Sequence, residues 1–567
     1  MHGSFAALAV QEPRRPERVR GMHRSCRVVQ GSKRPVFAAV LTLSVICALL
    51  LALPGETIAT KYLNDLFIFL DGAHRVTLGL VPNRDFHTAL GPLNYYIPAA
   101  GYWLSGDYGG AMPVGMALVV LAIGPAAAHV LDTRMRPAIG IPLAAFLILV
   151  AAVPINLGEE IRALSFAMFY NRIGWAALGF LLVMYLRPDR ARAHQILLDS
   201  VCAAFLVLSM LYIKVSYGVV GLGFLVFMLL DPRQRGWAST ALAMTLGVAL
   251  VVESIWQSSA AYLSDLFLAG RVSANARTID ELVQIVFNNF ADLVIFGIFV
   301  VLVLAGQRSV RDLLFMGFCA GSGYLLMGQN FQAWGIVSLM AGAAVAAETL
   351  ARLNEAAPPG RHPAVLAGAL PLLFAVLLPG TVHNTAALGL HAGLATARYG
   401  EAVPLPNFER IRLARLWSEG EYPSFARYLS SLADGARALA SLGPGAGHVL
   451  VLDFVGAFSA GLGLEPPRGD STWHHWGRTM NEENFLPPER LFADVRVVMD
   501  PKWAVEAWTA KGLRDLYADY LDEHYQLAED TADWRVYVTR QRPGEPEDTV
   551  SQTLDPEPDK ERRRRGG

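Results

Sequence analysis

The 567-residue chain contains little cysteine and little charge, and each shortage excludes something. Its cysteines are Cys26, Cys47, Cys202 and Cys319, so the long polar region after residue 380 can hold neither a disulfide framework nor a cysteine-based metal site. Charged residues make up only 17% of the chain, against about a quarter in soluble proteins. A net charge of -1 provides no general attraction for nucleic acid.

Apolar residues are abundant instead, at 53% of the chain with a mean hydropathy of +0.35. They are grouped in runs of membrane-spanning length, which predicts an α-helical polytopic membrane protein. At roughly 17–25 residues per crossing we expect about eleven transmembrane helices. The predicted crossings are residues 36–54, 111–131, 138–156, 166–186, 196–213, 216–230, 237–256, 284–305, 312–327, 331–347 and 363–379.

The arrangement of basic residues predicts the orientation in the membrane. The tail at 1–35 is basic, and with these crossings the other basic clusters fall on the same side: Arg134/Arg136, Arg187/Arg190/Arg192, Arg233/Arg235, Arg308/Arg311 and Arg352/Arg361. Because such clusters mark the cytoplasmic side, we expect a bacterial inner-membrane protein with a cytoplasmic N-terminus. The first apolar run is expected to be a retained anchor. The loops at 55–110, 157–165 and 257–283 and the chain after 380 are then extracytoplasmic.

These patterns predict four regions along the chain: a basic tail (1–35), a transmembrane domain (36–379), an extracytoplasmic domain (380–540) and a disordered tail (541–567) rich in Pro, Glu, Asp and Arg. In the region 380–540, apolar patterns predict helices at 422–442 and 503–525 and strands at 448–454, 495–499 and 534–539. Strands that alternate with helices are typical of a small α/β domain.

The first outer loop, residues 55–110, carries an unusual number of charged side chains among aromatic ones. If 61–80 forms an amphipathic helix at the outer membrane surface, Asp71 and Arg75 share one face and Asp65 lies about 120° from Asp71. Carboxylates at a membrane face are costly unless they are paired or functional. Interfacial ion pairs, Asp71/Arg75 and Arg84/Asp85, are the structural alternative to a site.

The same loop contains Gly-Leu-Val-Pro-Asn-Arg-Asp-Phe (79–86) and Gly-Pro-Leu-Asn-Tyr-Tyr (91–96) after an acidic residue among aromatics. This pattern resembles the first outer loop of GT-C glycosyltransferases, in the branch of the protein O-mannosyltransferases and the lipid A aminoarabinose transferase. Two departures are visible. The Asp-Glu pair frequent in that family is Asn64-Asp65 here, and Asn83-Arg84 stands where the family has tyrosine before the second Asp.

The resemblance implies an enzyme that moves a sugar, with inversion, from a polyprenyl-phosphate donor to an envelope glycan, lipid or protein acceptor. Such a reaction needs a general base, for which Asp65 and then Asp85 are the candidates. It also needs cations for the phosphate. A lipid phosphate is already a good leaving group, so no metal or other cofactor is indicated. The loop supplies Asp71, Arg75, Arg84 and His87 as substrate-binding candidates.

Other outer turns add further candidates for substrate binding: Glu159 and Arg162, Arg172 near a helix N-terminus, Lys214 between two adjacent crossings, and the amides Asn330 and Gln332. Snorkelling or turn chemistry explains these residues equally well. In the C-terminal region, Asp470-Ser471-Thr472-Trp473-His474-His475-Trp476 is open to three interpretations: packing, carbohydrate stacking or metal binding.

Two other functions compete with the glycosyltransferase. A transporter or flippase for lipid-linked saccharides would carry ionisable residues in mid-membrane, whereas here they concentrate at the outer ends of the crossings. A polysaccharide polymerase or ligase would also use outer loops, and an inactive scaffold is a further alternative. Donor lipid, acceptor and membrane lipid are the expected partners, and nucleic acid is not.

Overall fold

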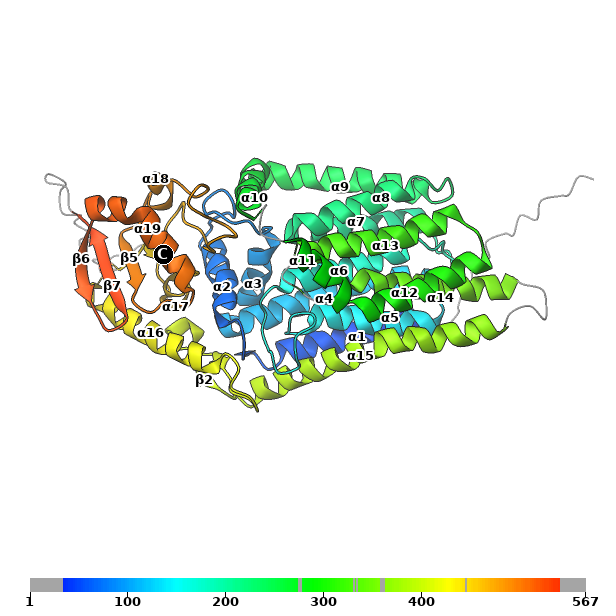
Figure 1. Ribbon diagram of the computed structural model, residues 1–567, viewed down its shortest axis with the longest axis horizontal. Helices are drawn as coiled ribbons and strands as arrows, with labels where there is room; N and C mark the ends of the chain where they lie inside the picture. The colour runs from blue at the N-terminus through cyan, green and yellow to red at the C-terminus, as the bar shows by residue number, and fades with distance from the viewer. Residues whose placement is uncertain are drawn as a thin grey trace, which may run out of the picture.

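The computed structural model describes residues 34–273, 278–329, 332, 335–356, 363–443 and 446–540. The molecule is elongated, with long, roughly parallel helices at one end and a small α/β part at the other (Figure 1). The first outer loop lies between these two parts. The predicted disordered tail at 541–567 and nearly all of the predicted basic tail lie outside the described residues.

Every predicted crossing overlaps a helix of this bundle. Six helices are long and apolar enough to cross a membrane, and the pair α11–α12, bent by 66°, would make a seventh. The remaining helices at predicted crossings are shorter or less apolar. The bundle helices are α1 (Pro35–Ala52), α4 (Tyr108–Arg134), α5 (Pro137–Ala152), α6 (Phe169–Val183), α7 (Gln195–Ile213), α8 (Val215–Met228), α9 (Arg235–Trp256), α11 (Ile279–Asn288), α12 (Phe290–Gly306), α13 (Val310–Gly328), α14 (Val337–Ala356) and α15 (Pro363–Thr396).

The outer surface of the bundle is apolar. On α9, Leu246, Leu250 and Ile255 are 62%, 62% and 78% exposed. A soluble protein rarely leaves so many large apolar side chains along one helix uncovered. The bundle is therefore that of a membrane-embedded protein.

Basic residues from several connections meet at the end of the bundle remote from the α/β part. Arg136 and Arg352 both pair with the buried Glu348, at 3.2 and 3.1 Å. Arg187 and Arg311 both lie 3.0 Å from Asp231. These ion pairs join loops whose basic residues predict that they lie on one side of the membrane.

The last bundle helix is longer than predicted. The sequence Leu378-Pro379-Gly380 suggests a helix end, yet α15 continues to Thr396. Gly380 lies against the ring of Phe146 on α5, where a Cβ would come within 2.9 Å of the ring. Packing of α15 along the bundle therefore outweighs the helix-breaking pair, and the predicted boundary at 380 falls inside a helix.

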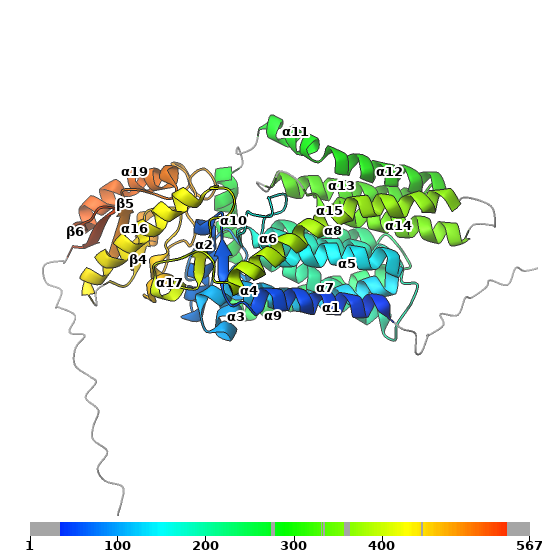
Figure 2. The same ribbon diagram turned by 90° about the horizontal axis from the view of Figure 1, so that it is seen from below.

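The C-terminal part contains a four-stranded sheet in the order β4-β5-β7-β6, in which β4 and β5 are parallel and the other pairs antiparallel. Strand β6 was not predicted; it is an edge strand that directly follows α19. Figure 2 shows the helices α16 and α19 beside this sheet. The elements are α16 (Tyr422–Ser441), β4 (Val449–Val451), α17 (Phe458–Leu462), α18 (Pro488–Leu491), β5 (Val497–Pro501), α19 (Ala507–His524), β6 (Tyr525–Asp530) and β7 (Trp534–Thr539).

A second, small sheet joins distant parts of the sequence. Strand β1 (Thr57–Ala59) of the first outer loop pairs in parallel with β3 (Ile411–Leu413), which in turn pairs with β2 (Glu401–Ala402). A short 3-10 helix, η1 (Pro406–Phe408), lies between β2 and β3. The backbone bonds of this sheet fix the start of the first outer loop against the chain that follows the bundle.

Helix α2 (Leu63–Thr77) forms where the amphipathic helix was predicted, and it ends before Gly79, whose φ of +86° suits glycine. It does not lie on an open surface, because the C-terminal part covers its polar face and nearly all its side chains are buried. Helix α3 (Leu93–Ser105) follows and packs on α4. Helix α10 (Ser259–Ser273) lies at the same junction (Figure 1).

Candidate active site at the junction of the two parts

A cavity of about 340 Å³ lies between the helix bundle and the C-terminal part. We call it the junction cavity. The first turn of α2, the connection 156–159, the first turn of α6 and loops of the C-terminal part all contribute to its walls. Of the predicted site residues, Asp65, Glu159, Arg172 and Gln332 line it.

Asp65 lies in the first turn of α2 and is half-buried in the cavity wall. Burial raises the pKa of its carboxyl group to about 7, and the nearby Arg478 guanidinium opposes this rise while Glu421 and Glu506 add to it. Burial of a carboxylate away from water favours its neutral form. A carboxyl group with such a pKa can accept a proton at neutral pH, as a general base must.

Arg172 provides a buried positive charge on the same cavity. Its side chain is 1% exposed, and Nη1 donates to the carbonyls of Ile155 and Ala167 at 2.9 and 3.1 Å and to Oδ1 of Asn156 at 3.3 Å. Nε and Nη2 are buried and meet no acceptor among the described residues. Within that part of the chain, the guanidinium also forms no ion pair. A buried guanidinium with two donor nitrogens that lack acceptors is suited to bind an anion.

A second cation, Lys214, lies beside this part of the cavity wall. Nζ of Lys214, in the turn between α7 and α8, donates to Oδ1 of Asn171 at 3.2 Å and lies 5.0 Å from the ring of Tyr170. Burial lowers the pKa of Lys214 to about 7, and the positive charge of Arg478 lowers it further. A phosphate beside these groups would favour the protonated amine.

The C-terminal part supplies the opposite wall, with Phe454, Trp473, His475, Arg478 and Glu506. Burial, with a contribution from Arg478, lowers the pKa of His475 to about 4, so its imidazole is neutral at pH 7. Burial raises the pKa of Glu506. The cavity therefore combines carboxyl groups, cations and aromatic rings.

The predicted residues Glu159 and Gln332 organise the cavity rim. Glu159 accepts hydrogen bonds from Nζ of Lys61 and from the hydroxyl of Tyr62, each at 3.0 Å. Gln332 accepts from the indole of Trp175 at 3.1 Å and donates to the carbonyl of Gly335 at 3.2 Å. These contacts hold the two side chains in fixed positions at the cavity.

Asp71 and Arg75, also predicted, lie outside the junction cavity. Arg75 donates through Nε to Asp71 at 2.8 Å and through Nη2 to Asp470 at 3.0 Å, and all three side chains are buried. Nη1 donates to the carbonyl of Pro467 at 2.7 Å. This arrangement is an ion-pair link between α2 and the C-terminal part.

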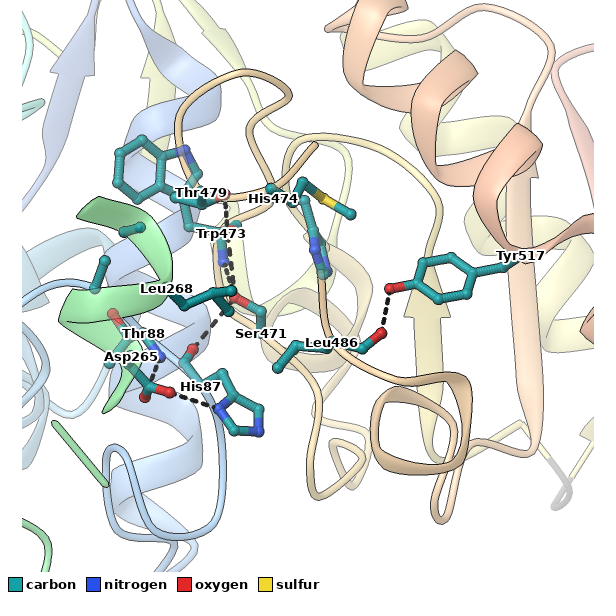
Figure 3. A pocket seen from close by; sticks show the side chains of 13 residues that line it. His87, Thr88, Asp265, Leu268, Ser471, Trp473, His474, Thr479, Leu486 and Tyr517 are labelled. Carbon is teal, nitrogen blue, oxygen red and sulfur yellow. Dashed lines mark hydrogen bonds and ion pairs between the residues drawn. The ribbon is translucent and has the colours of Figure 1, made fainter. Parts of the chain in front are cut away.

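His87 lines a second, smaller cavity of about 40 Å³ (Figure 3). Its Nδ1 lies 2.8 Å from Oδ1 of Asp265 on α10, whose other oxygen accepts from Asn83 and from the backbone of Thr88. The hydroxyl of Ser471 donates to the carbonyl of His87 at 3.2 Å. His87 therefore helps to join three segments and does not face the junction cavity.

The remaining predicted residues lie elsewhere. Oδ2 of Asp85 accepts from the backbone of Val81 at 2.7 Å and from Arg84 at 3.1 Å, away from the junction cavity. Arg162 pairs with Glu160 on the wall of a neighbouring pocket. Asn330 lies outside the described residues.

Sequence reasoning singled out the 470–476 segment without linking it to Asp65, and it gave no signal for Phe454, Arg478 or Glu506. Within the described ranges, no group of three or more His, Cys, Asp or Glu side chains is placed to hold a metal ion. The histidines of the segment diverge: His474 lies 3.3 Å from Asp470, while His475 reaches the junction cavity.

In comparisons with known proteins, no protein-family model, no curated protein and no solved structure matches this chain.

Proposed function

We propose that this protein is an integral membrane glycosyltransferase that moves a sugar from a polyprenyl phosphate to an acceptor hydroxyl on the outer face of the membrane. The observation that carries the proposal is the junction cavity, which Asp65 and the incompletely bonded guanidinium of Arg172 both line. A base and an anion site in one cavity are what transfer from a lipid phosphate requires. The resemblance of the first outer loop to GT-C enzymes agrees with this assignment.

In the proposed reaction, Asp65 takes the proton of the acceptor hydroxyl as its oxygen attacks the anomeric carbon. The bond between that carbon and the phosphate oxygen breaks, and the electron pair leaves with the lipid phosphate. Attack from the face opposite the phosphate inverts the anomeric configuration. Arg172, with Lys214 and Arg478 nearby, stabilises the negative charge of the leaving phosphate.

The membrane arrangement belongs to the same proposal. We infer about eleven crossings, including the shorter helices α5, α6 and α8, in a bacterial inner membrane with the N-terminus in the cytoplasm. The ion pairs that gather basic connections at one end of the bundle support this orientation. The junction cavity and the C-terminal part then lie on the outer side, where a lipid-linked envelope sugar is available.

The test is sugar transfer in liposomes from a panel of polyprenyl-phosphate sugars to cell-envelope acceptor fractions. Asp65→Asn should lower the rate by about a hundredfold to ten-thousandfold, because the base is lost and the shape is kept. Asp85→Asn is the matched control, since Asp85 caps the backbone of Val81 and lies outside the cavity. If the parent consumes the donor and Asp65→Asn does so at the same rate, Asp65 is not the general base. Intact parent protein that consumes no donor would argue for transport or a scaffold.

A further inference from the structure

The wall that the C-terminal part contributes to the junction cavity contains buried side-chain nitrogens whose hydrogen-bonding capacity the described residues do not use. Nε1 of Trp473 and Nδ1 of His475 are buried and have no partner among the described residues. On the bundle side, Nδ2 of Asn156 is also buried and has no hydrogen-bond partner among the described residues, and Asn156 is 8% exposed. All three residues line the junction cavity, so one ligand in it would lie beside all three.

The surroundings of Trp473 define which part of the indole is available. Its ring meets the rings of Phe454 and His475 edge to face, at centroid distances of 6.2 and 5.7 Å. The guanidinium of Arg478 lies 5.3 Å from the ring centroid, and the whole residue is only 9% exposed. The indole is therefore packed on its faces, and its contribution to a ligand is the N–H group at its edge.

A tryptophan N–H is a donor only, so its partner must be an acceptor. Leaving such a donor unpaired in a buried position is costly, so the wall favours a ligand that carries a hydrogen-bond acceptor. The neutral imidazole of His475 and the carboxyl group of Glu506 add groups that can accept hydrogen bonds from the same ligand. A ligand that accepts and donates at several neighbouring positions matches this wall.

We propose that this wall binds the sugar ring carried by the lipid phosphate, with the Trp473 N–H and the Asn156 amide donating to ring oxygens and Glu506 accepting from a ring hydroxyl. Sugar hydroxyls both donate and accept, and they follow one another around the ring. The inference rests on the proposed function, because Arg172 holds the phosphate to which the ring is attached. The C-terminal part then belongs to the active site itself.

Binding of two probes to the purified full chain in detergent tests this inference. One probe is citronellyl phosphate, and the other is citronellyl phosphate bearing a single sugar, taken as a panel of hexoses and pentoses. The parent should bind the best sugar-bearing probe more tightly than the bare phosphate. Trp473→Phe should lower the affinity for the sugar-bearing probe about three- to tenfold, the usual effect of losing one hydrogen bond. The affinity for citronellyl phosphate should stay unchanged.

Two variants make the result specific. Glu506→Gln keeps the shape of the side chain. It should also lower the affinity for the sugar-bearing probe and leave the affinity for citronellyl phosphate unchanged. Trp508→Phe, on the same domain with a side chain 77% exposed, is the matched control and should behave as the parent. Equal affinity of the parent for both probes would overturn the proposed sugar site but would still agree with a phosphate site at Arg172. No affinity for either probe would overturn the proposed function together with this inference.

Discussion

Arg75 of α2 and Asp470 of the C-terminal part form an ion pair of 3.0 Å in which both side chains are almost fully buried. The same guanidinium holds Asp71 on its own helix at 2.8 Å. Asp65 lies near the start of this helix, and Trp473 follows Asp470 closely in the chain. The link therefore fixes the distance between two walls of the junction cavity.

Replacing Arg75 with methionine should destabilise the protein by about 3–5 kcal/mol, because two buried carboxylates lose the guanidinium that pairs with both of them. Equilibrium unfolding in mixed micelles measures the loss. Arg84→Met is the control, since the Arg84 side chain is 47% exposed where it pairs with Asp85. An exposed pair is worth under about 1 kcal/mol. Similar losses in the two variants would show that the buried link does not hold the parts together.

The rate of sugar transfer should depend on pH through Asp65. Burial raises the pKa of this carboxyl group to about 7, so the basic form dominates only above that pH. The rate should rise about tenfold per pH unit below the pKa and level off above it. Arg478→Gln removes the positive charge that holds the pKa down, so its profile should move to higher pH. A profile that is flat between about pH 5 and pH 8 would exclude Asp65 as the base.

The raised pKa of Asp65 also makes the stability of the folded protein fall as pH rises, whereas the rate of transfer rises. The pKa of Asp65 is about 7 in the folded protein and near the ordinary 3.8 when unfolded, so the folded state binds the proton more tightly. Its contribution is complete below the unfolded pKa and is lost as pH rises through about 7. Asp65→Asn, which stays neutral, should therefore raise the thermal midpoint over the parent at about pH 8 and scarcely at about pH 4. A midpoint difference independent of pH would contradict the shift.

Much of the bundle could be predicted because apolar runs of membrane-spanning length have few alternatives to a helix. Asp65 and Arg172 were also within reach, since Asp65 stands in the first outer loop and Arg172 at the start of a predicted crossing. Strand β6 was not, because its residues are mostly exposed at the sheet edge and show no alternation. Helix α15 continues beyond the predicted crossing at 363–379 to Thr396, and Gly380 lies against the ring of Phe146.

The C-terminal half of the junction cavity could not be predicted for a different reason. Trp473, Arg478 and Glu506 reach Asp65 only through contacts between segments several hundred residues apart, such as the pairing of β1 with β3 and the Arg75–Asp470 ion pair. Local patterns report helices and strands, whereas these contacts depend on the assembled fold.

Arg172 should be dispensable for folding and required for binding phosphate. No described acidic side chain pairs with its guanidinium, so Arg172→Met removes a buried charge without leaving a carboxylate unpaired. The thermal midpoint of the variant alone should fall little or rise. Citronellyl phosphate at a hundred times its dissociation constant should stabilise the parent by about 2.7 kcal/mol, and this gain should vanish in the variant. Equal stabilisation of both proteins would place the phosphate elsewhere.

The position of α2 depends on a glycine that faces a buried tyrosine ring. A Cβ on Gly72 would lie 2.0 Å from Cδ1 of Tyr95, whose hydroxyl lies 2.9 Å from Oγ1 of Thr472. Tyr95 is 0% exposed and cannot turn aside without breaking that contact. Gly72→Ala should thus cost about 1–3 kcal/mol of stability from overpacking, and it should also lower sugar transfer, because Asp65 lies on the displaced helix.

The matched control for Gly72→Ala is Gly270→Ala, since Gly270 also lies inside a helix, α10, and has no atom within 4 Å of a Cβ built on it. Alanine has the higher helix propensity, so this variant should gain about 0.5–1 kcal/mol and keep full activity. Unfolding in mixed micelles and the liposome transfer assay measure both effects. If Gly72→Ala kept the parent's stability and lost its activity, the substitution would act on the site alone, and the contact with Tyr95 would not be what positions α2.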